Sequence, residues 1–165
     1  SVRREHPYRS VWYEWVGNWR AIWYLYEAID GPAHRGVLLV GNPFTMLAGL
    51  PALLWALWAG LWRGRRDVLV FLALYAASLG LWIVSSKPIQ FYYHYLLPGT
   101  FLMAILALAL DALWQVRRWH LGWLAPLALL TSAGMFAHFY PILSAAPLCC
   151  GRPSFAWWMW LDSWR

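Results

Sequence analysis

The chain has 165 residues, of which 62% are hydrophobic and only 12% are charged, and its formal net charge is +6. A soluble domain has roughly 45–50% apolar and about 25% charged residues, so this composition excludes an ordinary soluble protein and indicates a membrane protein. The basic residues mostly flank apolar runs, where they orient helices and contact anionic lipid headgroups. The positive charge therefore does not indicate a nucleic-acid partner.

The segment ahead of the first apolar run, residues 1–43, is charged and rich in aromatic residues. Five of its aromatic residues recur at intervals of three and four: Trp12, Trp15, Trp19, Trp23 and Tyr26. This spacing is typical of one face of a helix, and it predicts an interfacial helix that lies along the membrane surface and ends near residues 30–32, Asp-Gly-Pro. Alternatively, the same stripe forms a wall of a substrate cleft. The chain starts at Ser1 without an early apolar run of the signal-peptide type, and we expect it to be the later part of a longer protein.

Four apolar stretches have the length of about 17–25 residues that a helix needs to cross the hydrocarbon core: 44–62, 68–86, 96–114 and 121–143. A helix satisfies all its own backbone hydrogen bonds, which makes it the form expected for such stretches in lipid. The predicted fold class is therefore all-α integral membrane, with four transmembrane helices in residues 44–143 preceded by the aromatic interfacial helix. Their centres are almost purely apolar, which argues against a transporter or channel.

The connections between the spans alternate in charge. Residues 63–67 and 115–120 are short and basic, and the positive-inside rule places them in the cytoplasm. Residues 1–43, residues 87–95 and the tail 144–165 then face the opposite, outer side. The orientation rests on the basic residues nearest the span ends, because the amino-terminal segment also carries arginines farther away.

The motifs of soluble enzymes are absent from the sequence: there is no phosphate-cradling glycine loop, no nucleophile elbow and no spaced Cys and His set. No metal site is expected. Asp111 lies near a span end, where an ion pair with Arg117 or Arg118 is expected, and His138 is expected to be a helix-packing residue. The adjacent Cys149 and Cys150 suit neither a mutual disulfide nor a metal site, and free surface thiols are expected.

The strip 87–95, KPIQFYYHY, opens the third span and is the strongest candidate for a binding site. Lys87 and His94 lie at the depth of a lipid headgroup phosphate, and a lysine and a protonatable imidazole can offset phosphate charge. Tyr92, Tyr93 and Tyr95 can pack against a prenyl chain or a sugar. The alternative is an aromatic belt with a snorkelling lysine.

Four short motifs follow one another along the chain: His6-Pro7-Tyr8 with Ser10 and Trp12; residues 20–27, RAIWYLYE; Gly41-Asn42-Pro43; and residues 91–96, FYYHYL. Over nearly its whole length the chain resembles the carboxy-terminal four-transmembrane region of the bacterial protein O-mannosyltransferases. These belong to the dolichyl-phosphate-mannose–protein mannosyltransferase family of GT-C glycosyltransferases. The chain departs from the family pattern at Val16 and Ala21, where proline is usual, at Lys87, near which arginine is common, and at Leu97, an additional residue.

The resemblance implies inverting transfer of mannose from a polyprenyl- or dolichyl-phosphate carrier to Ser or Thr hydroxyls of a translocated protein. The family's catalytic acid belongs to an Asp-Glu pair in the first outer loop, upstream of these residues, so no catalytic residue is expected here and the fragment alone should be inactive. The resemblance implies no cofactor besides the lipid-linked donor substrate. It places residues 1–43, 87–95 and 144–165 on the periplasmic face of a bacterial inner membrane.

Roles for individual residues follow from the resemblance. Lys87 and His94 would lie near the carrier phosphate, and the three tyrosines of the strip along the lipid or sugar. Arg20, Trp12 and Trp15 would lie on the acceptor side. Two alternatives remain open: a non-catalytic four-helix accessory or scaffold protein, and a GT-C enzyme with another sugar or a lipid acceptor.

Overall fold

The computed structural model of the chain describes residues 8–85, 87–116, 118–149 and 152–165. Its main elements are four long helices: α2 (Pro43–Leu61), α3 (Arg66–Val84), α4 (Leu96–Gln115) and α5 (Leu124–Leu143). Each is long and apolar enough to cross a membrane, which confirms the prediction of four spanning helices. Their bounds lie close to the predicted ones.

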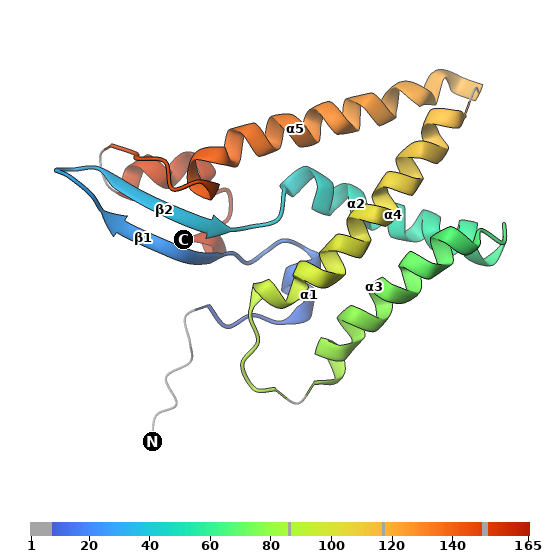
Figure 1. Cartoon of the computed structure of the whole chain (residues 1–165), viewed down its shortest axis with the longest axis horizontal. Helices are drawn as coiled ribbons and strands as arrows, with labels where there is room; N and C mark the ends of the chain where they lie inside the picture. The colour runs from blue at the N-terminus through green and yellow to red at the C-terminus, as the bar shows by residue number, and fades with distance from the viewer. Residues whose placement is uncertain (1–7, 86, 117, 150–151) are drawn as a thin grey trace.

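Helices α2, α3 and α4 pack against one another, whereas α5 diverges from them (Figure 1). The packed faces of α2 use small residues, among them Ala52 and Ala56, which let helices approach closely in a membrane. Gly49 shows how close α4 comes, because a Cβ at this position would lie 2.7 Å from side-chain atoms of Leu102. Ile105 of α4 is also fully buried in this core.

The predicted interfacial helix is wrong for most of its length. Only α1 (Trp12–Val16) is helical, and it is followed by an antiparallel hairpin of β1 (Ile22–Ala28) and β2 (His34–Leu39). The helix stops at Gly17 and Asn18, and Asn18 has a φ of 55°, outside the helical range. The following run IWYLYEA is rich in aromatic and branched residues, which fit the surface of a strand.

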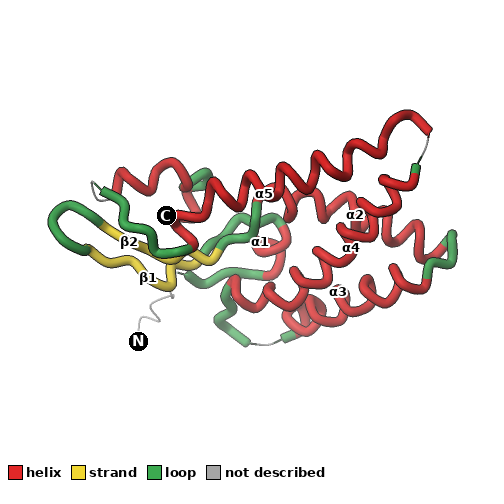
Figure 2. Tube along the Cα trace, turned by 45° about the horizontal axis from the view of Figure 1, so that its top comes forward, coloured by secondary structure: helices red, strands yellow, loops and turns green. Residues whose placement is uncertain are grey.

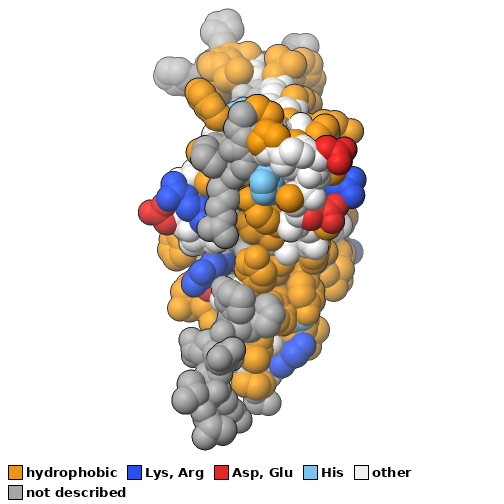
Figure 3. All heavy atoms as spheres, turned by 90° about the vertical axis from the view of Figure 1, so that its left-hand side faces the viewer, with side chains coloured by type: hydrophobic (Ala, Val, Ile, Leu, Met, Phe, Trp, Pro, Cys, Tyr) orange, Lys and Arg blue, Asp and Glu red, His pale blue; other side chains and the backbone are white. Residues whose placement is uncertain are grey.

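The hairpin, α1 and the carboxy-terminal 3-10 segments η3 (Arg152–Trp158) and η4 (Asp162–Trp164) lie at one end of the helices, here called the hairpin end (Figures 1 and 2). A second hydrophobic core joins the hairpin, the last turns of α5 and the tail: Ala21, Leu38, Phe139, Ile142, Phe155, Met159 and Trp164. Figure 3 looks onto this end, where hydrophobic side chains cover much of the face and charged ones are few and scattered. The other end, here called the turn end, carries the α2–α3 turn and η2 (Arg118–Trp123).

The hairpin end also contains the start of α4, preceded by η1 (Tyr92–Tyr95). The described parts of residues 1–43, 87–95 and 144–165 therefore share one end of the bundle (Figure 1). Which side of the membrane that end faces remains a prediction.

Candidate functional site

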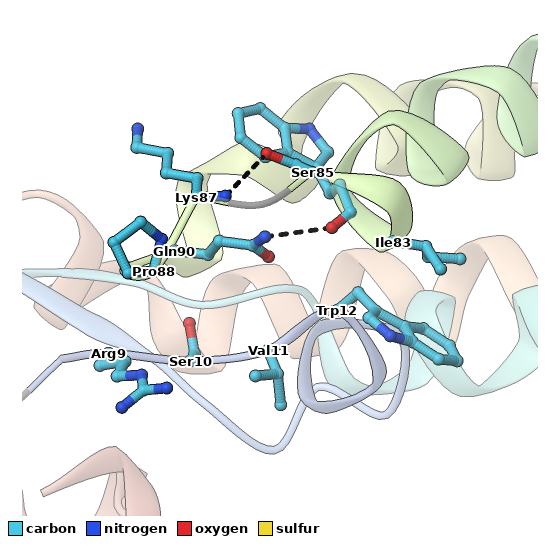
Figure 4. A pocket seen from close by; sticks show the side chains of 10 residues that line it. Arg9, Ser10, Val11, Trp12, Ile83, Ser85, Lys87, Pro88 and Gln90 are labelled. Atoms are coloured by element: carbon cyan, nitrogen blue, oxygen red, sulfur yellow. Dashed lines mark hydrogen bonds between the residues drawn. The ribbon is translucent and has the colours of Figure 1, made fainter.

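A pocket of about 280 Å³ lies at the hairpin end, between the segment that leads into α1 and the connection from α3 to α4 (Figure 4). It is here called the hairpin-end pocket, and its lining residues are Arg9, Ser10, Val11, Trp12, Trp82, Ile83, Ser85, Lys87, Pro88 and Gln90. Two of these side chains, Arg9 and Lys87, are cationic, and no acidic side chain lines the pocket among the residues that the structure describes. The pocket suits an anionic group beside an apolar one.

Hydrogen bonds hold the two walls of this pocket together. The Ser10 amide donates to the Gln90 carbonyl at 2.9 Å, and the Gln90 side chain donates to the Trp82 carbonyl at 3.0 Å. The Trp15 indole donates to Ser10 Oγ at 2.8 Å, which anchors the wall to α1. Within the wall that contains Trp82 and Gln90, the Lys87 amide donates to Ser85 Oγ at 3.3 Å (Figure 4).

Lys87 and His94, the two residues predicted to hold a phosphate, both contact Trp82. Lys87 Nζ lies 5.9 Å from the centroid of the Trp82 ring, within cation–π range. The His94 ring stacks on the same indole with a centroid distance of 3.7 Å. Its Nε2 is buried and has no hydrogen-bond partner among the described residues. Lys87 thus lines the pocket, whereas His94 lies behind Trp82 in an aromatic cluster.

The three tyrosines of the strip have different surroundings. The Tyr92 hydroxyl is buried, donates to Asn18 Oδ1 at 2.8 Å and accepts from the Gly41 amide at 3.0 Å. The Tyr95 hydroxyl is buried and hydrogen-bonded to that of Tyr75 at 2.9 Å. Tyr93 is 38% exposed. Of the three, only Tyr93 presents an accessible ring to a ligand.

The three residues predicted on the acceptor side are also separated. Trp12 lines the hairpin-end pocket, while Trp15 is fully buried against Trp82 and His94. The Arg20 side chain donates to Glu14 Oε1 at 3.0 Å, and Glu14 Oε2 accepts from the amide that begins α1. Arg20 and Trp15 therefore stabilise α1, and Trp12 is the one of the three at the pocket.

No model of a known protein family matches the chain. Over 122 residues, however, it is 32% identical to the polyprenol-phosphate-mannose–protein mannosyltransferase of Corynebacterium glutamicum, a match that covers 69% of this chain and 23% of that protein. Its fold is similar to that of part of a chain in the S. cerevisiae protein O-mannosyltransferase Pmt1–Pmt2 complex bound to the sugar donor, with a TM-score of 0.65, 22% identity, and coverage of 98% of this chain and 24% of the solved chain. The chain is similar to a membrane region of the protein O-mannosyltransferases. It spans about a quarter of the length of these relatives.

One motif of this mannosyltransferase-like region has a clear structural role. Asn42 Oδ1 accepts from the amides of Phe44 and Thr45, and Pro43 occupies the first helical position, so the two residues begin α2. Asn42 Nδ2 also donates to the Ser132 carbonyl of α5 at 2.9 Å. Another motif begins with His6 and Pro7, which lie outside the described residues.

Sequence reasoning missed Arg9, Trp82 and Gln90 as pocket residues and Asn18 as a junction. Asn18 Nδ2 donates to the Gly41 carbonyl at 2.9 Å, and the Asn18 carbonyl accepts from the indole of Trp164 at 3.0 Å. The junction thus joins the amino-terminal segment, the starts of α2 and α4, and the tail. In the sequence these residues are scattered among ordinary loop and span positions, and no local spacing groups them.

The remaining expectations have mixed outcomes. Cys149 is disulfide-bonded, so the expectation of a free thiol there is wrong, and Cys150 lies outside the described residues.

Asp111 accepts from Gln115 at 2.8 Å, while Arg117, one of its two expected ion-pair partners, is outside the described part. His138 lies in α5, and its ring contacts Trp160. The described residues hold no group of three His, Cys, Asp or Glu side chains that could bind a metal ion.

Proposed function

We propose that the chain is the carboxy-terminal membrane part of a polyprenyl-phosphate-mannose-dependent protein O-mannosyltransferase, which transfers mannose to Ser or Thr hydroxyls at the outer, periplasmic face. The observation that carries this proposal is the 32% identity to a mannosyltransferase whose name states both the donor and the protein acceptor. The catalytic carboxylate would belong to the rest of the protein. This chain would supply part of the donor site.

The hairpin-end pocket is the proposed place for the carrier phosphate. Lys87 and Arg9 would offset the phosphate charge, and a charge-assisted hydrogen bond from an ammonium is roughly twice as strong as a neutral one. The apolar side chains of Trp12 and Ile83 offer the adjoining surface to a prenyl chain. His94 would act as a positioning residue, because its stacking fixes the plane of Trp82 beneath Lys87.

These contacts also support the chemistry of transfer. The acceptor hydroxyl attacks the anomeric carbon, its proton passes to a carboxylate outside this chain, and the bond between the anomeric carbon and the phosphate oxygen breaks. Negative charge grows on the departing phosphate. A fixed cation beside that phosphate, such as Lys87, stabilises the transition state more than the ground state.

The test is mannose transfer by the protein expressed from its gene in membranes, supplied with radiolabelled polyprenyl-phosphate mannose and a Ser/Thr-containing peptide. Lys87→Ala is expected to lower kcat/KM about tenfold or more, equivalent to about 1.4 kcal/mol, whereas Lys87→Arg keeps most of the activity. Arg63→Ala, at the turn end, is the matched control and should not change transfer.

Near-normal turnover by Lys87→Ala would remove Lys87 from the donor site. If the unaltered protein transfers another sugar, or uses a lipid acceptor, the GT-C alternative replaces mannose transfer to protein. An accessory protein would instead show no transfer with any donor, yet be required for the activity of a separate glycosyltransferase.

A further inference from the structure

A second cavity, of about 460 Å³, lies between α2, α4 and α5, within the part of the chain that can cross a membrane. It is here called the α5 cleft. Its walls are residues of α2 from Phe44 to Trp55, the half of α4 nearest the turn end, and the half of α5 from Leu124 to Thr131. All the lining side chains are apolar except Thr131, whose hydroxyl donates to the Leu127 carbonyl at 2.8 Å. A polar ligand would find no hydrogen-bond partner in this cleft.

The cleft exists because α5 diverges from α2 and α4 while the facing positions are small. Ala52 of α2, Ala109 of α4 and Ala128 of α5 all line it. An apolar cavity within a bilayer forfeits packing contacts unless apolar atoms fill it. In a membrane, the surrounding lipid is the source of such apolar atoms.

The dimensions of the cleft favour a single hydrocarbon chain. From Phe44 to Trp55 the helix rises roughly 16 Å at 1.5 Å per residue, about half the ~30 Å of the hydrocarbon core. Dividing the cavity volume of about 460 Å³ by that length gives a cross-section of about 28 Å². A cleft that is this long and narrow suits one extended hydrocarbon chain.

The charges at the turn end complement an anionic headgroup. The Arg65 guanidinium carbon lies 5.5 Å from the ring centroid of Trp55, which lines the cleft, and Arg63 lies equally close to Trp58. Arg65 also donates to Asp67 Oδ2 at 2.5 Å, so its charge is paired, and the other charged side chains described around this end are Arg63 and Arg66 against Asp111. The local balance is positive, and a positive patch at the membrane surface attracts anionic lipid.

We propose that the α5 cleft binds one acyl chain of an anionic phospholipid, with the headgroup at the turn end beside Arg65. The site shares no lining residue with the hairpin-end pocket and does not depend on the proposed transfer reaction. The lipid would fill the gap between α5 and the other helices, and so would fix the position of α5.

The experiment uses the protein expressed from its gene, purified and reconstituted into vesicles of phosphatidylglycerol or of phosphatidylcholine. Each vesicle contains a trace of the same phospholipid with a photoactivatable diazirine in an acyl chain, and mass spectrometry locates the label after illumination. We expect label on the lining residues of α2, α4 and α5, at least threefold more with phosphatidylglycerol than with phosphatidylcholine.

Two variants test the site separately. Ala128→Phe fills the cleft and should lower its labelling at least fivefold, whereas Leu129→Phe, at the adjacent position that is 63% exposed, should change it less than twofold. Arg65→Gln should remove the preference for phosphatidylglycerol, and Arg35→Gln, on the hairpin, should preserve it. If Ala128→Phe fails to fold, Arg65→Gln decides.

Label no greater in the cleft than on the exposed face of α5, or cleft label unchanged in a folded Ala128→Phe, would overturn the proposal. Equal labelling from both lipids would overturn the headgroup assignment. Displacement of the label by excess polyprenyl phosphate would identify the donor's prenyl chain as the occupant instead, and would contradict the phospholipid.

Discussion

The indole of Trp82 and the imidazole of His94 lie face to face, with ring centroids 3.7 Å apart and ring planes 9° apart. Trp82 belongs to the last turn of α3 and His94 to η1, just before α4, so the stack joins two helices behind the hairpin-end pocket. Lys87 lies over the same indole. A change at His94 therefore affects both helix packing and the position of the lysine.

Substitutions at His94 test whether its ring or its polarity matters. His94→Ala removes a ring from a packed aromatic cluster and should cost about 2–4 kcal/mol of unfolding free energy. His94→Phe keeps a ring and eliminates a buried Nε2 that has no partner among the described residues, so it should stay within about 1 kcal/mol of the unaltered protein. Unfolding by SDS titration in micelles measures both. Equal losses for the two variants would mean that the nitrogen itself is needed.

Tyr92→Phe tests the junction around Asn18. It deletes a buried hydroxyl that donates to Asn18 Oδ1 and accepts from the Gly41 amide, while the direct hydrogen bond from that amide to Asn18 Oδ1 at 3.1 Å remains. Because both groups keep one partner, the expected loss is about 0.5–1.5 kcal/mol in the same titration. The neighbouring ring supplies the control, since Tyr93→Phe alters an exposed tyrosine and should have little effect.

Gly41→Ala should also destabilise the hairpin end. A Cβ at Gly41 would lie 2.6 Å from the Tyr92 hydroxyl and 2.8 Å from Asn18 Oδ1, closer than ordinary contacts. Overpacking of this kind costs about 1–3 kcal/mol. Gly80→Ala is the matched change, because a Cβ there meets nothing within 4 Å and alanine favours the helix. If neither Gly41→Ala nor Gly80→Ala changes the free energy of unfolding, the junction around Asn18 can relax to accept the added Cβ.

Trp164→Phe should loosen the tail. It removes the indole donor to the Asn18 carbonyl while keeping an aromatic ring near Phe139. Limited proteolysis should then cut the carboxy-terminal segment several-fold faster than in the unaltered protein. Trp157 is 77% exposed, and Trp157→Phe should leave the cleavage rate unchanged. Identical cleavage rates for both variants would show that the hydrogen bond from the Trp164 indole to the Asn18 carbonyl does not hold the tail in place.

The hairpin shows why part of the hairpin end was not predictable from local pattern. The spacing of Trp15, Trp19 and Trp23 fits a helix, but β1 forms because β2 pairs with it and because Leu38 and the tail bury its inner side. Of these partners, β2 follows β1 directly after the turn 29–33, whereas the tail lies far away in the chain, and no window around the tryptophans contains it. The side-chain directions in the strip 87–95 were also not predictable from local pattern. Lys87 lines the pocket, while Tyr92 and Tyr95 turn inward to partners on other elements.

The sequence by itself determined the four spanning helices and the start of α2. Long uncharged stretches must satisfy their backbone hydrogen bonds internally in lipid, and Asn42 with Pro43 caps a helix through local contacts. Only the tertiary structure decided the packing of the hairpin against the tail, the position of Lys87 and Arg9 around one pocket, and the α5 cleft. Each of these depends on which distant surfaces meet, and packing between distant segments leaves no periodic signal in the chain.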